Sequence, residues 1–249
     1  MIYNLIIYLY VSAVRVAALF NKKVSHMVKG EQEAFSVLKR NIVPGEKYLW
    51  FHAASLGEFE QGRPIIEEIR KRYPHYRILQ TFFSPSGYEV RKDYKGADVV
   101  CYLPLDTPGN VRRFLDLARP HMAFFIKYEF WQNYLNELHA RNIPVYSVSS
   151  IFRPGQIFFR WYGGSYRKVL RTFTHLFVQN EESVRLLKEI GVTATTIVGD
   201  TRFDRVLEIC RQAKELPLVE HFKGGNEKTL VAGSSWAPDE DIFCLLYTS

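Results

Sequence analysis

Two glutamates in this sequence stand where a carboxylate is able to take a proton from a hydroxyl group. Glu58 comes soon after the apolar run 48–52, and Glu129 follows the apolar run 122–126. A carboxylate in such a place is suited to general base catalysis, because it accepts the proton of an attacking hydroxyl. Glutamate is also common in a first helical turn for stability alone, so position by itself leaves both interpretations open.

Other residues near Glu58 limit the kind of site. Gly57 leaves room for a substrate to approach the backbone, because glycine has no Cβ. His52 ends the first apolar run, where a hydrogen-bonded structural imidazole is favoured over a catalytic one. The histidines show no metal-ligand spacing, and the cysteines lie far apart without a C-x-x-C pair. The sequence therefore argues against a zinc site or a disulfide framework and favours a reducing compartment.

Short apolar runs alternate along the chain with segments of helical periodicity. Strands are expected at residues 48–52, 77–83, 99–103, 122–126, 144–148, 175–178 and 195–198. Helices are expected from near residue 57 to 73 and at residues 88–94, 108–118, 131–140 and 181–190. Strands separated by helices predict βαβ units and an α/β fold with a parallel sheet. Ligands of such sheets bind beyond the carboxyl ends of the strands, so the loops there are expected to form the site.

Composition and charge bound the class of protein. The chain has 249 residues, 47% of them hydrophobic and 24% charged, which excludes a disordered or low-complexity chain. The length fits one large domain, or one domain and part of another. The absence of G-x-G-x-x-G and G-K-[ST] argues against a dinucleotide fingerprint and a P-loop. The net charge of +7 predicts an anionic partner, which is a membrane surface, nucleic acid or a phosphorylated substrate.

The segment Ile2–Phe20 is almost entirely apolar, and basic residues follow it. A helix that spans a membrane needs about 20 apolar residues. The excess of Lys and Arg after this segment predicts that the rest of the chain stays on the cytoplasmic side. A membrane anchor, either spanning or interfacial, is therefore favoured. An amphipathic helix that packs on the domain is the alternative.

A second unusual stretch, residues 151–174, mixes basic and aromatic residues and contains no acid. This mixture is typical of a membrane interface, where aromatic rings meet lipid and cations meet phosphates. It also suits single-stranded nucleic acid. A basic helix that covers the sheet, with its aromatic side chains in the core, is favoured as much as these functional interpretations.

Seven short motifs together resemble those of the 3-deoxy-D-manno-octulosonic acid (Kdo) transferases, which build the inner core of lipopolysaccharide. Residues 51–58, F-H-A-A-S-L-G-E, resemble the family motif H-x-x-S-x-G-E. The others are T-F-F-S-P-S-G at 81–87, Y-L-P-L-D at 102–106, E-F-W at 129–131, Q-N-E at 179–181, G-D-T-R-F-D at 199–204 and A-G-S-S at 232–235. Each motif is weak alone, but their order and spacing hold across residues 1 to about 243.

The resemblance implies a GT-B glycosyltransferase, in which two Rossmann-like domains face a cleft. Members of the family are inverting, use no metal or cofactor, and are anchored at the inner membrane facing the cytoplasm. The implied partners are CMP-Kdo as donor, the lipid A precursor (lipid IVA) as acceptor and the anionic inner-membrane surface, with no nucleic acid. The implied domains are a membrane anchor at 1–22, a Rossmann-like acceptor-binding domain at 23–208 and the truncated start of a nucleotide-sugar-binding domain at 226–249.

The resemblance also assigns roles to single residues. Glu58 matches the family's general base, whose role is to deprotonate the acceptor hydroxyl as it attacks the anomeric carbon and CMP leaves. The implied acceptor-binding residues are Ser55, Gly57, Ser84, Ser86, Gly87, Glu129 and Arg153. The implied donor-binding residues are Arg202, Gly233, Ser234 and Ser235. Two positions depart from the family pattern: Lys127 stands where many members have Glu, and Trp236 stands where many have His.

The C-terminal part of the chain is expected to begin a second domain. Residues 228–235 are predicted to form its first strand and loop, and residues 238–243 to open its first helix. Residues 244–249 match neither a helix end nor the family, so they are interpreted as foreign sequence and the chain as an inactive fragment. Two other classes stay open, a non-catalytic membrane-associated lipid-binding module and a GT-B transferase for another sugar nucleotide. Nucleic-acid binding ranks last, because no recognised motif is present.

Overall fold

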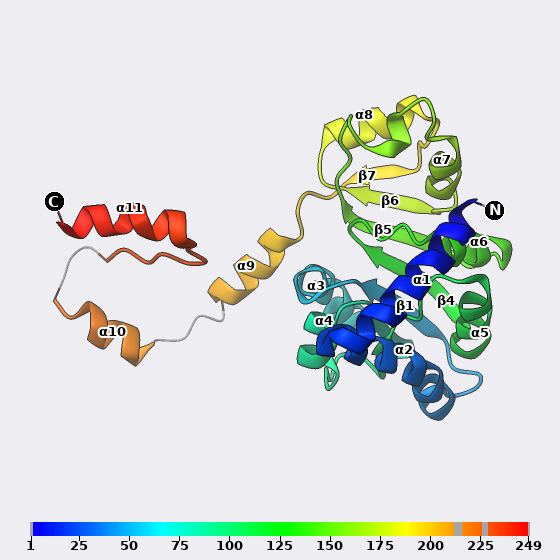
Figure 1. Cartoon of the computed structure of the whole chain (residues 1–249), viewed down its shortest axis with the longest axis horizontal. Helices are drawn as coiled ribbons and strands as arrows, with labels where there is room; N and C mark the ends of the chain where they lie inside the picture. Colours follow the sequence, from blue (N-terminus) through cyan, green and yellow to red (C-terminus); the bar gives the residue numbers. More distant parts are fainter. Residues whose placement is uncertain (1, 212–215, 226–228, 249) are drawn as a thin grey trace. The chain divides into compact units, whose positions relative to one another are not determined.

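The structure is a computed structural model that describes residues 2–211, 216–225 and 229–248. It divides into two compact units, Met1–Glu208 and Ile209–Ser249, and each is described by itself. The first unit contains the sheet and the helices from α1 to α8 (Figure 1).

A seven-stranded parallel sheet forms the centre of the first unit (Figure 1). Its strands are β1 (Tyr48–Ala53), β2 (Arg77–Phe82), β3 (Val99–Tyr102), β4 (Pro120–Ile126), β5 (Val145–Ser150), β6 (His175–Val178) and β7 (Thr195–Ile197). The order across the sheet is β3-β2-β1-β4-β5-β6-β7. The order 3-2-1-4-5-6 is that of a Rossmann fold, and here β7 extends it. The α/β class and the parallel sheet expected from the sequence are confirmed.

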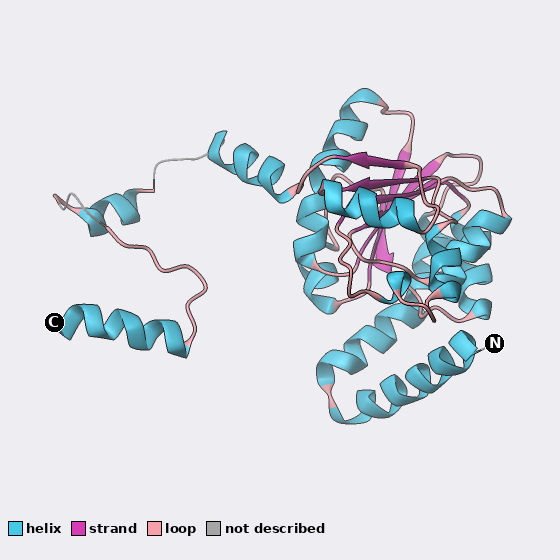
Figure 2. Cartoon of the chain, turned by 90° about the horizontal axis from the view of Figure 1, so that it is seen from above, coloured by secondary structure: helices cyan, strands magenta, loops and turns pink. Residues whose placement is uncertain are grey.

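Both faces of the sheet are apolar. Successive side chains of a strand point to opposite faces, so neighbouring residues of one strand lie in different cores. Trp50 belongs to the larger core, to which side chains of these α-helices contribute: α2 (Lys22–Asn41), α5 (Pro108–Ala118), α6 (Gln132–Ala140), α7 (Gly164–Leu170) and α8 (Glu181–Glu189). Phe51 belongs to the second core, with side chains of α3 (Leu56–Arg72) and α4 (Pro85–Arg91). Figure 2 shows helices on both sides of the strands. Strands buried on both faces read as continuous apolar runs, which is why the sequence revealed them.

Most predicted elements lie within a few residues of their observed bounds, and local capping explains the main shift. Helix α5 and strand β6 match the predicted bounds residue for residue. Helix α4 begins at Pro85, earlier than the predicted 88, because the Ser84 side chain accepts a hydrogen bond from the Ser86 backbone N–H and caps the helix. Proline suits the first helical position, since its missing N–H is not needed there.

Helix α1 (Ile2–Phe20) packs by one face only against the rest of the first unit and lies beside α2 (Figure 2). Its Ile7 and Val11 form a buried cluster with Leu105, and the Tyr3 hydroxyl donates to Asp106 Oδ2 at 2.6 Å. Val14 is also buried, against Met27 and Tyr102. Most other large apolar side chains of α1 are exposed: Ile2, Leu5, Ile6, Tyr8, Leu9, Tyr10, Val16, Leu19 and Phe20. By length and composition α1 is apolar enough to cross a membrane. Packing on the domain, the alternative interpretation, therefore covers only part of its apolar surface.

The second unit contains helices but no strand among its described residues. Helix α9 (Arg202–Arg211) crosses the boundary between the units, and α10 (Pro217–Lys223) and α11 (Ala237–Thr248) follow. A strand followed by a loop is predicted at 228–235; residues 229–235 form no strand, so that part of the prediction is wrong, and residue 228 lies outside the described residues. A strand needs a paired neighbour for its backbone groups, and the described part of this unit supplies none. The expectation that residues 244–249 do not fit a helix end is also wrong, since α11 continues through Thr248, whereas residue 249 is not described.

Candidate functional site

The order of the strands brings the two sequence-selected glutamates to the same place. Strands β1 and β4 are neighbours, and the chain leaves them in opposite directions, through β2 and β3 on one side and β5 to β7 on the other. Glu58 follows β1 and Glu129 follows β4. In open α/β sheets, ligands bind at such a reversal of strand order, beyond the carboxyl ends of the strands. The region beyond the carboxyl ends of β1 and β4 is therefore the candidate site, and we call it the crevice.

Glu58 occupies the third position of α3 and its carboxylate folds back over the start of the helix. Its Oε2 accepts hydrogen bonds from the backbone N–H groups of Ala54 at 2.6 Å and Ser55 at 3.2 Å. Burial raises the pKa of Glu58, and the negative charge of Glu129 raises it further. The two backbone donors and His52 oppose the shift without cancelling it. A carboxylate with a raised pKa is a stronger base, and its protonation equilibrium lies closer to neutral pH.

Glu129 is held at the edge of the crevice by two ring nitrogens. Its Oε2 accepts a hydrogen bond from Trp131 Nε1 at 2.6 Å and lies 3.2 Å from His52 Nε2. The Trp131 ring packs against Phe83, with ring centroids 5.0 Å apart. Phe83 also contacts the α1 cluster, so side chains of α1 and of the crevice pack on the same ring. The Glu129 side chain is 12% exposed and remains accessible to a ligand.

The interpretation of His52 as a buried, hydrogen-bonded imidazole is consistent with its contacts, but it missed the link to Glu129. The ring is fully buried, and its Nδ1 lies 2.9 Å from Thr81 Oγ1. His52 and Thr81 are partners in the register of β1 and β2. Both residues belong to motifs noted in the sequence, and that shared membership was the only signal of their role. Sequence reasoning had no means to see that the two motifs meet in space.

The loops after β1 and β2 are joined, which brings the predicted acceptor-binding serines together. The Ser84 backbone N–H donates to the Ala54 carbonyl at 2.7 Å. Ser84 Oγ lies 2.9 Å from Ser86 Oγ at the start of α4, and Ser55 stands at the start of α3. Gly57 is exposed, and a Cβ built there would meet nothing within 4 Å. Ser55, Gly57, Ser84 and Ser86 thus line one edge of the site.

Gly87 has a packing role in this structure. A Cβ at this position would lie 2.3 Å from the buried ring of Phe82 and 3.2 Å from the backbone nitrogen of Leu56. Contacts under about 3 Å are strongly repulsive, so any side chain at position 87 displaces the phenyl ring or the helix. The absence of a side chain allows α4 to approach the start of α3, which itself carries Glu58.

The other predicted binding residues follow β5 and β7 or lie in the second unit, and Arg202 interacts electrostatically with Tyr128, next to Glu129 in the sequence. Arg153 is exposed in the loop after β5, and Arg202, at the start of α9, forms an ion pair with Asp200 through its Nε at 2.8 Å. Gly233, Ser234 and Ser235 belong to the second unit, where Ser235 Oγ donates to Glu240 Oε1 at 3.3 Å.

Two residues near the carboxyl ends of β4 and β5 adopt left-handed backbone conformations. Lys127 has φ of 63° and Ser149 has φ of 57°, values that are uncommon outside glycine. The Gln179 side chain donates to the Ser149 carbonyl at 2.9 Å and holds that turn. Such conformations persist where the surroundings enforce them, and they cluster at functional sites. Lys127, which departs from the family pattern, helps Arg202 to lower the pKa of Asp200.

The basic and aromatic stretch divides into a buried and an exposed part. Phe152, Phe158 and Phe173 are buried in the larger core, and Arg167 donates to the carbonyls of Phe158 and Arg160 beside the short helix η1 (Ile157–Phe159). Trp161 is 90% exposed and Tyr162 is also exposed. The core interpretation therefore holds for the three phenylalanines, whereas Trp161 and Tyr162 form an exposed aromatic pair next to Arg160.

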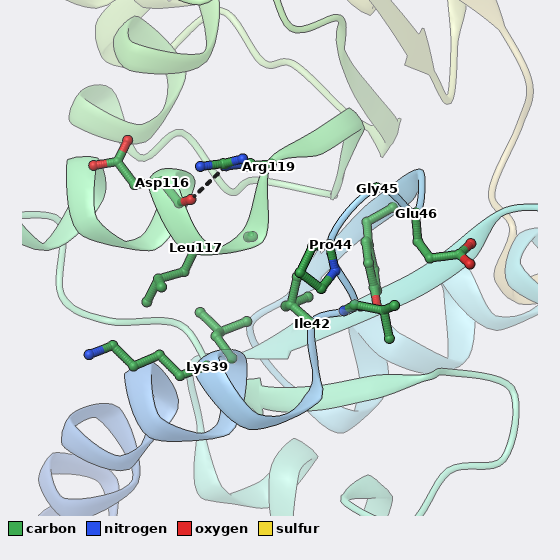
Figure 3. A pocket seen from close by; sticks show the side chains of 12 residues that line it. Lys39, Ile42, Pro44, Gly45, Glu46, Asp116, Leu117 and Arg119 are labelled. Carbon is green, nitrogen blue, oxygen red and sulfur yellow. Dashed lines mark hydrogen bonds between the residues drawn. The ribbon is translucent and has the colours of Figure 1, made fainter.

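A hollow of about 280 Å³ lies at the opposite edge of the sheet (Figure 3). It is lined by residues of α2, the loop to β1 and the end of α5, including Lys39, Pro44 and Leu117. Arg119 Nε donates to the Asp116 carbonyl at 3.1 Å in its wall. Because this hollow lies where β1 and β4 begin, it is far along the strands from both glutamates and is not part of the candidate site.

A family model described as 3-Deoxy-D-manno-octulosonic-acid transferase (kdotransferase) matches residues 28–205. The chain belongs to this family. The Kdo transferase of Aquifex aeolicus is 30% identical over 216 residues, which are 84% of this chain and 53% of the relative. The Kdo transferase of Haemophilus influenzae is 36% identical over 102 residues, 41% of this chain and 24% of the relative. The chain thus spans about half the length, or less, of these curated relatives.

Solved structures support the same fold. UDP-GlcNAc 2-epimerase from Neisseria meningitidis, bound to UDP-GlcNAc, matches with a TM-score of 0.53 at 15% identity over 71% of this chain and 53% of that one. The UDP-GlcNAc 2-epimerase of Methanocaldococcus jannaschii matches with a TM-score of 0.51 at 16% identity, over 70% and 52% of the two chains. These likenesses concern the fold alone, and they agree with the Rossmann-like, GT-B type domain expected from the sequence.

Proposed function

We propose that this chain is the acceptor-binding part of an inverting glycosyltransferase that transfers Kdo from CMP-Kdo to the lipid A precursor, lipid IVA. The observation that carries the proposal is the position of Glu58 in the crevice beyond β1 and β4, with its pKa raised by burial and by Glu129. Family membership supports the choice of sugar. Residues 23–208 bind the acceptor in this proposal, and residues 226–249 begin the part that binds the sugar nucleotide.

In the proposed reaction Glu58 is the general base. A hydroxyl of the acceptor attacks the anomeric carbon of Kdo, and its proton passes to the Glu58 carboxylate. The bond between that carbon and the phosphate oxygen breaks, and CMP leaves with the electron pair. Two backbone N–H groups hold Oε2 of Glu58, which orients the carboxylate for this transfer. The open backbone at Gly57 allows the acceptor to come close.

The remaining polar residues bind the two substrates in this proposal. Ser55, Ser84 and Ser86 donate to acceptor oxygens at the joined loops after β1 and β2, with Glu129 on the other side of the crevice. Gly87 contributes indirectly, by allowing α4 to approach α3, and Arg153 binds the acceptor further out. On the donor side, Arg202 attracts the phosphate of CMP-Kdo, and Gly233, Ser234 and Ser235 contact the nucleotide.

Helix α1 is proposed to hold the protein on the cytoplasmic face of the inner membrane. It leaves an apolar face exposed while its other face packs near Phe83, which in turn contacts Trp131 beside Glu129. An apolar helix face beside cationic residues favours the surface of an anionic bilayer. A lipid acceptor held in that bilayer then reaches the crevice without leaving the membrane.

The test is transfer of Kdo to lipid IVA by the full-length protein that carries this chain, with CMP-Kdo as donor. Glu58→Gln keeps the size of the side chain and removes the base, so kcat is expected to fall by about 10²- to 10⁴-fold. The matched control is Glu68→Gln on the same helix, where the side chain is exposed and pairs with Arg72. It lies about 15 Å along the helix from Glu58. Equal activity of Glu58→Gln and Glu68→Gln contradicts the assignment of the base.

A further inference from the structure

A buried chain of polar side chains leads from the middle of the sheet to Glu129. Trp50, His52 and Thr81 come from the central strands β1 and β2 and are fully buried. Buried polar groups in folded proteins are nearly always hydrogen-bonded, because water is not there to satisfy them. Trp50 Nε1 lies 2.8 Å from Thr81 Oγ1, and that oxygen lies 2.9 Å from His52 Nδ1.

The direction of these hydrogen bonds follows from the chemistry of the groups. Tryptophan Nε1 only donates, so Thr81 Oγ1 accepts from Trp50. The single hydroxyl hydrogen of Thr81 has two acceptors within reach, His52 Nδ1 at 2.9 Å and the Phe51 carbonyl at 3.4 Å. The shorter contact is the stronger hydrogen bond, so Thr81 donates to Nδ1. The hydrogen of a neutral imidazole then sits on Nε2 of His52.

This tautomer matches the other end of the chain. His52 Nε2 faces Glu129 Oε2 at 3.2 Å, and a carboxylate oxygen only accepts. The opposite tautomer would turn the lone pair of Nε2 toward the lone pairs of the carboxylate, which is repulsive. Trp131 Nε1 donates to the same Oε2 at 2.6 Å. Among the described residues no hydrogen bond to Glu129 Oε1 is present, so that oxygen is left for a ligand.

We propose that His52 is a positioning residue whose Nε2–H, fixed by the Trp50–Thr81 pair, orients the Glu129 carboxylate so that Oε1 meets the acceptor. The proposal deepens the proposed function and rests on it for the identity of the ligand. His52 itself does not touch substrate, because its ring is fully buried. Its effect on transfer therefore passes through Glu129.

The surroundings of His52 give a second reason for this role. Its ring packs edge-on against Phe125, with centroids 5.7 Å apart, and against Trp131 at 6.4 Å. An imidazole buried among aromatic rings costs free energy unless both nitrogens are paired. Among the described residues, the partner of Nδ1 is Thr81 and the partner of Nε2 is Glu129. An apolar residue would fill the same space without orienting the carboxylate.

The first test reads the tautomer in the intact 249-residue chain, without any activity. The protein is labelled with ¹⁵N-histidine, and long-range ¹H–¹⁵N spectra are recorded near neutral pH. His52→Gln identifies the His52 signals, and His139→Gln, at an exposed position on α6, removes a different set. The expected result is a bare Nδ1 and a protonated Nε2 for His52. A proton on Nδ1 with a bare Nε2 overturns the proposal.

The second test measures kcat/KM of the full-length protein for lipid IVA in a double-mutant cycle. His52→Phe keeps a ring and removes the donor, and a loss of about 10- to 100-fold is expected from a misplaced Glu129. His52→Gln places an amide N–H near Glu129 and is expected to restore part of that loss. Adding His52→Phe to Glu129→Gln is expected to cost little more than Glu129→Gln alone, since both act through one group. If the losses of kcat/KM from His52→Phe and Glu129→Gln multiply in the double variant, the proposal is overturned.

The two tests separate this proposal from the proposed function. If the full-length protein transfers no Kdo, the proposed function fails, and the tautomer still decides whether His52 donates to Glu129. If His52→Phe does not fold, two measurements still test the proposal. One is the tautomer of the wild-type chain, and the other is the comparison of kcat/KM between His52→Gln and Glu129→Gln.

Discussion

Gly57 and Gly87 both lie in the first turn of a helix, in α3 and α4. A side chain would meet open space at Gly57 but would clash with its neighbours at Gly87. Gly87→Ala places a methyl group 2.3 Å from the ring of Phe82 and 3.2 Å from the backbone nitrogen of Leu56. The ring is fully buried, and its neighbours belong to the second core. Overpacking of this kind costs about 1–3 kcal/mol of the free energy of unfolding. For a unit of this size, about 2–4 °C of melting temperature is lost per kcal/mol, so Tm is expected to fall by about 2–12 °C.

Gly57→Ala is the matched control for this prediction. The added methyl group meets nothing within 4 Å and lies near the start of α3, where alanine is a better helix former than glycine. The free energy of unfolding is therefore expected to stay the same or to rise by up to about 1 kcal/mol. Binding of lipid IVA is expected to weaken in Gly57→Ala, because the methyl group occupies the path of the acceptor.

The measurements are thermal unfolding by circular dichroism on the two purified variants and calorimetric titration with lipid IVA. An unchanged Tm for Gly87→Ala refutes the packing role of this glycine. A fall in Tm for Gly57→Ala as large as that of Gly87→Ala refutes the reasoning from free space.

Three further predictions follow from the charges and exposed groups of the structure. Glu129→Gln removes a negative charge that raises the pKa of Glu58, so the acid limb of the pH profile of kcat/KM should move to lower pH; an unmoved limb argues against the coupling. Burial raises the pKa of Glu31 to about 8, so the stability due to this group is full below its unfolded pKa of about 4.3 and is lost as pH rises through about 8. Unfolding at pH 6 and pH 9 should therefore show a smaller alkaline loss of Tm for Glu31→Gln than for wild type. Trp161→Ala should weaken co-sedimentation with anionic vesicles and change the free energy of unfolding by less than about 0.5 kcal/mol, because the ring is 90% exposed.

The types and approximate bounds of the elements were readable from the sequence. The continuous apolar runs predicted β1 to β6 because strands buried on both faces carry no polar alternation. The early start of α4 was missed, since it depends on the cap that Ser84 forms with the Ser86 backbone. Of the strand and loop expected at 228–235, no strand is present among the described residues 229–235, because an apolar run becomes a strand only beside a partner.

The candidate site was only partly readable. The places of Glu58 and Glu129 after apolar runs predict both as site residues, and the motifs support both. The binding role of Gly87 stays a prediction, and the structure adds a packing role through its contact with Phe82. The link from His52 to Glu129 spans 77 residues, and no local pattern reports a contact over that separation.

By itself, the sequence determined the α/β class, the alternation of strands and helices, and the motifs that mark the family. These are local properties, since the period of apolar side chains is written in consecutive residues. Only the tertiary structure decided that β4 lies beside β1, and with it that Glu129 meets His52 and raises the pKa of Glu58. Strand order depends on the packing of segments distant in the chain, so the geometry of the crevice is a property of the whole sheet.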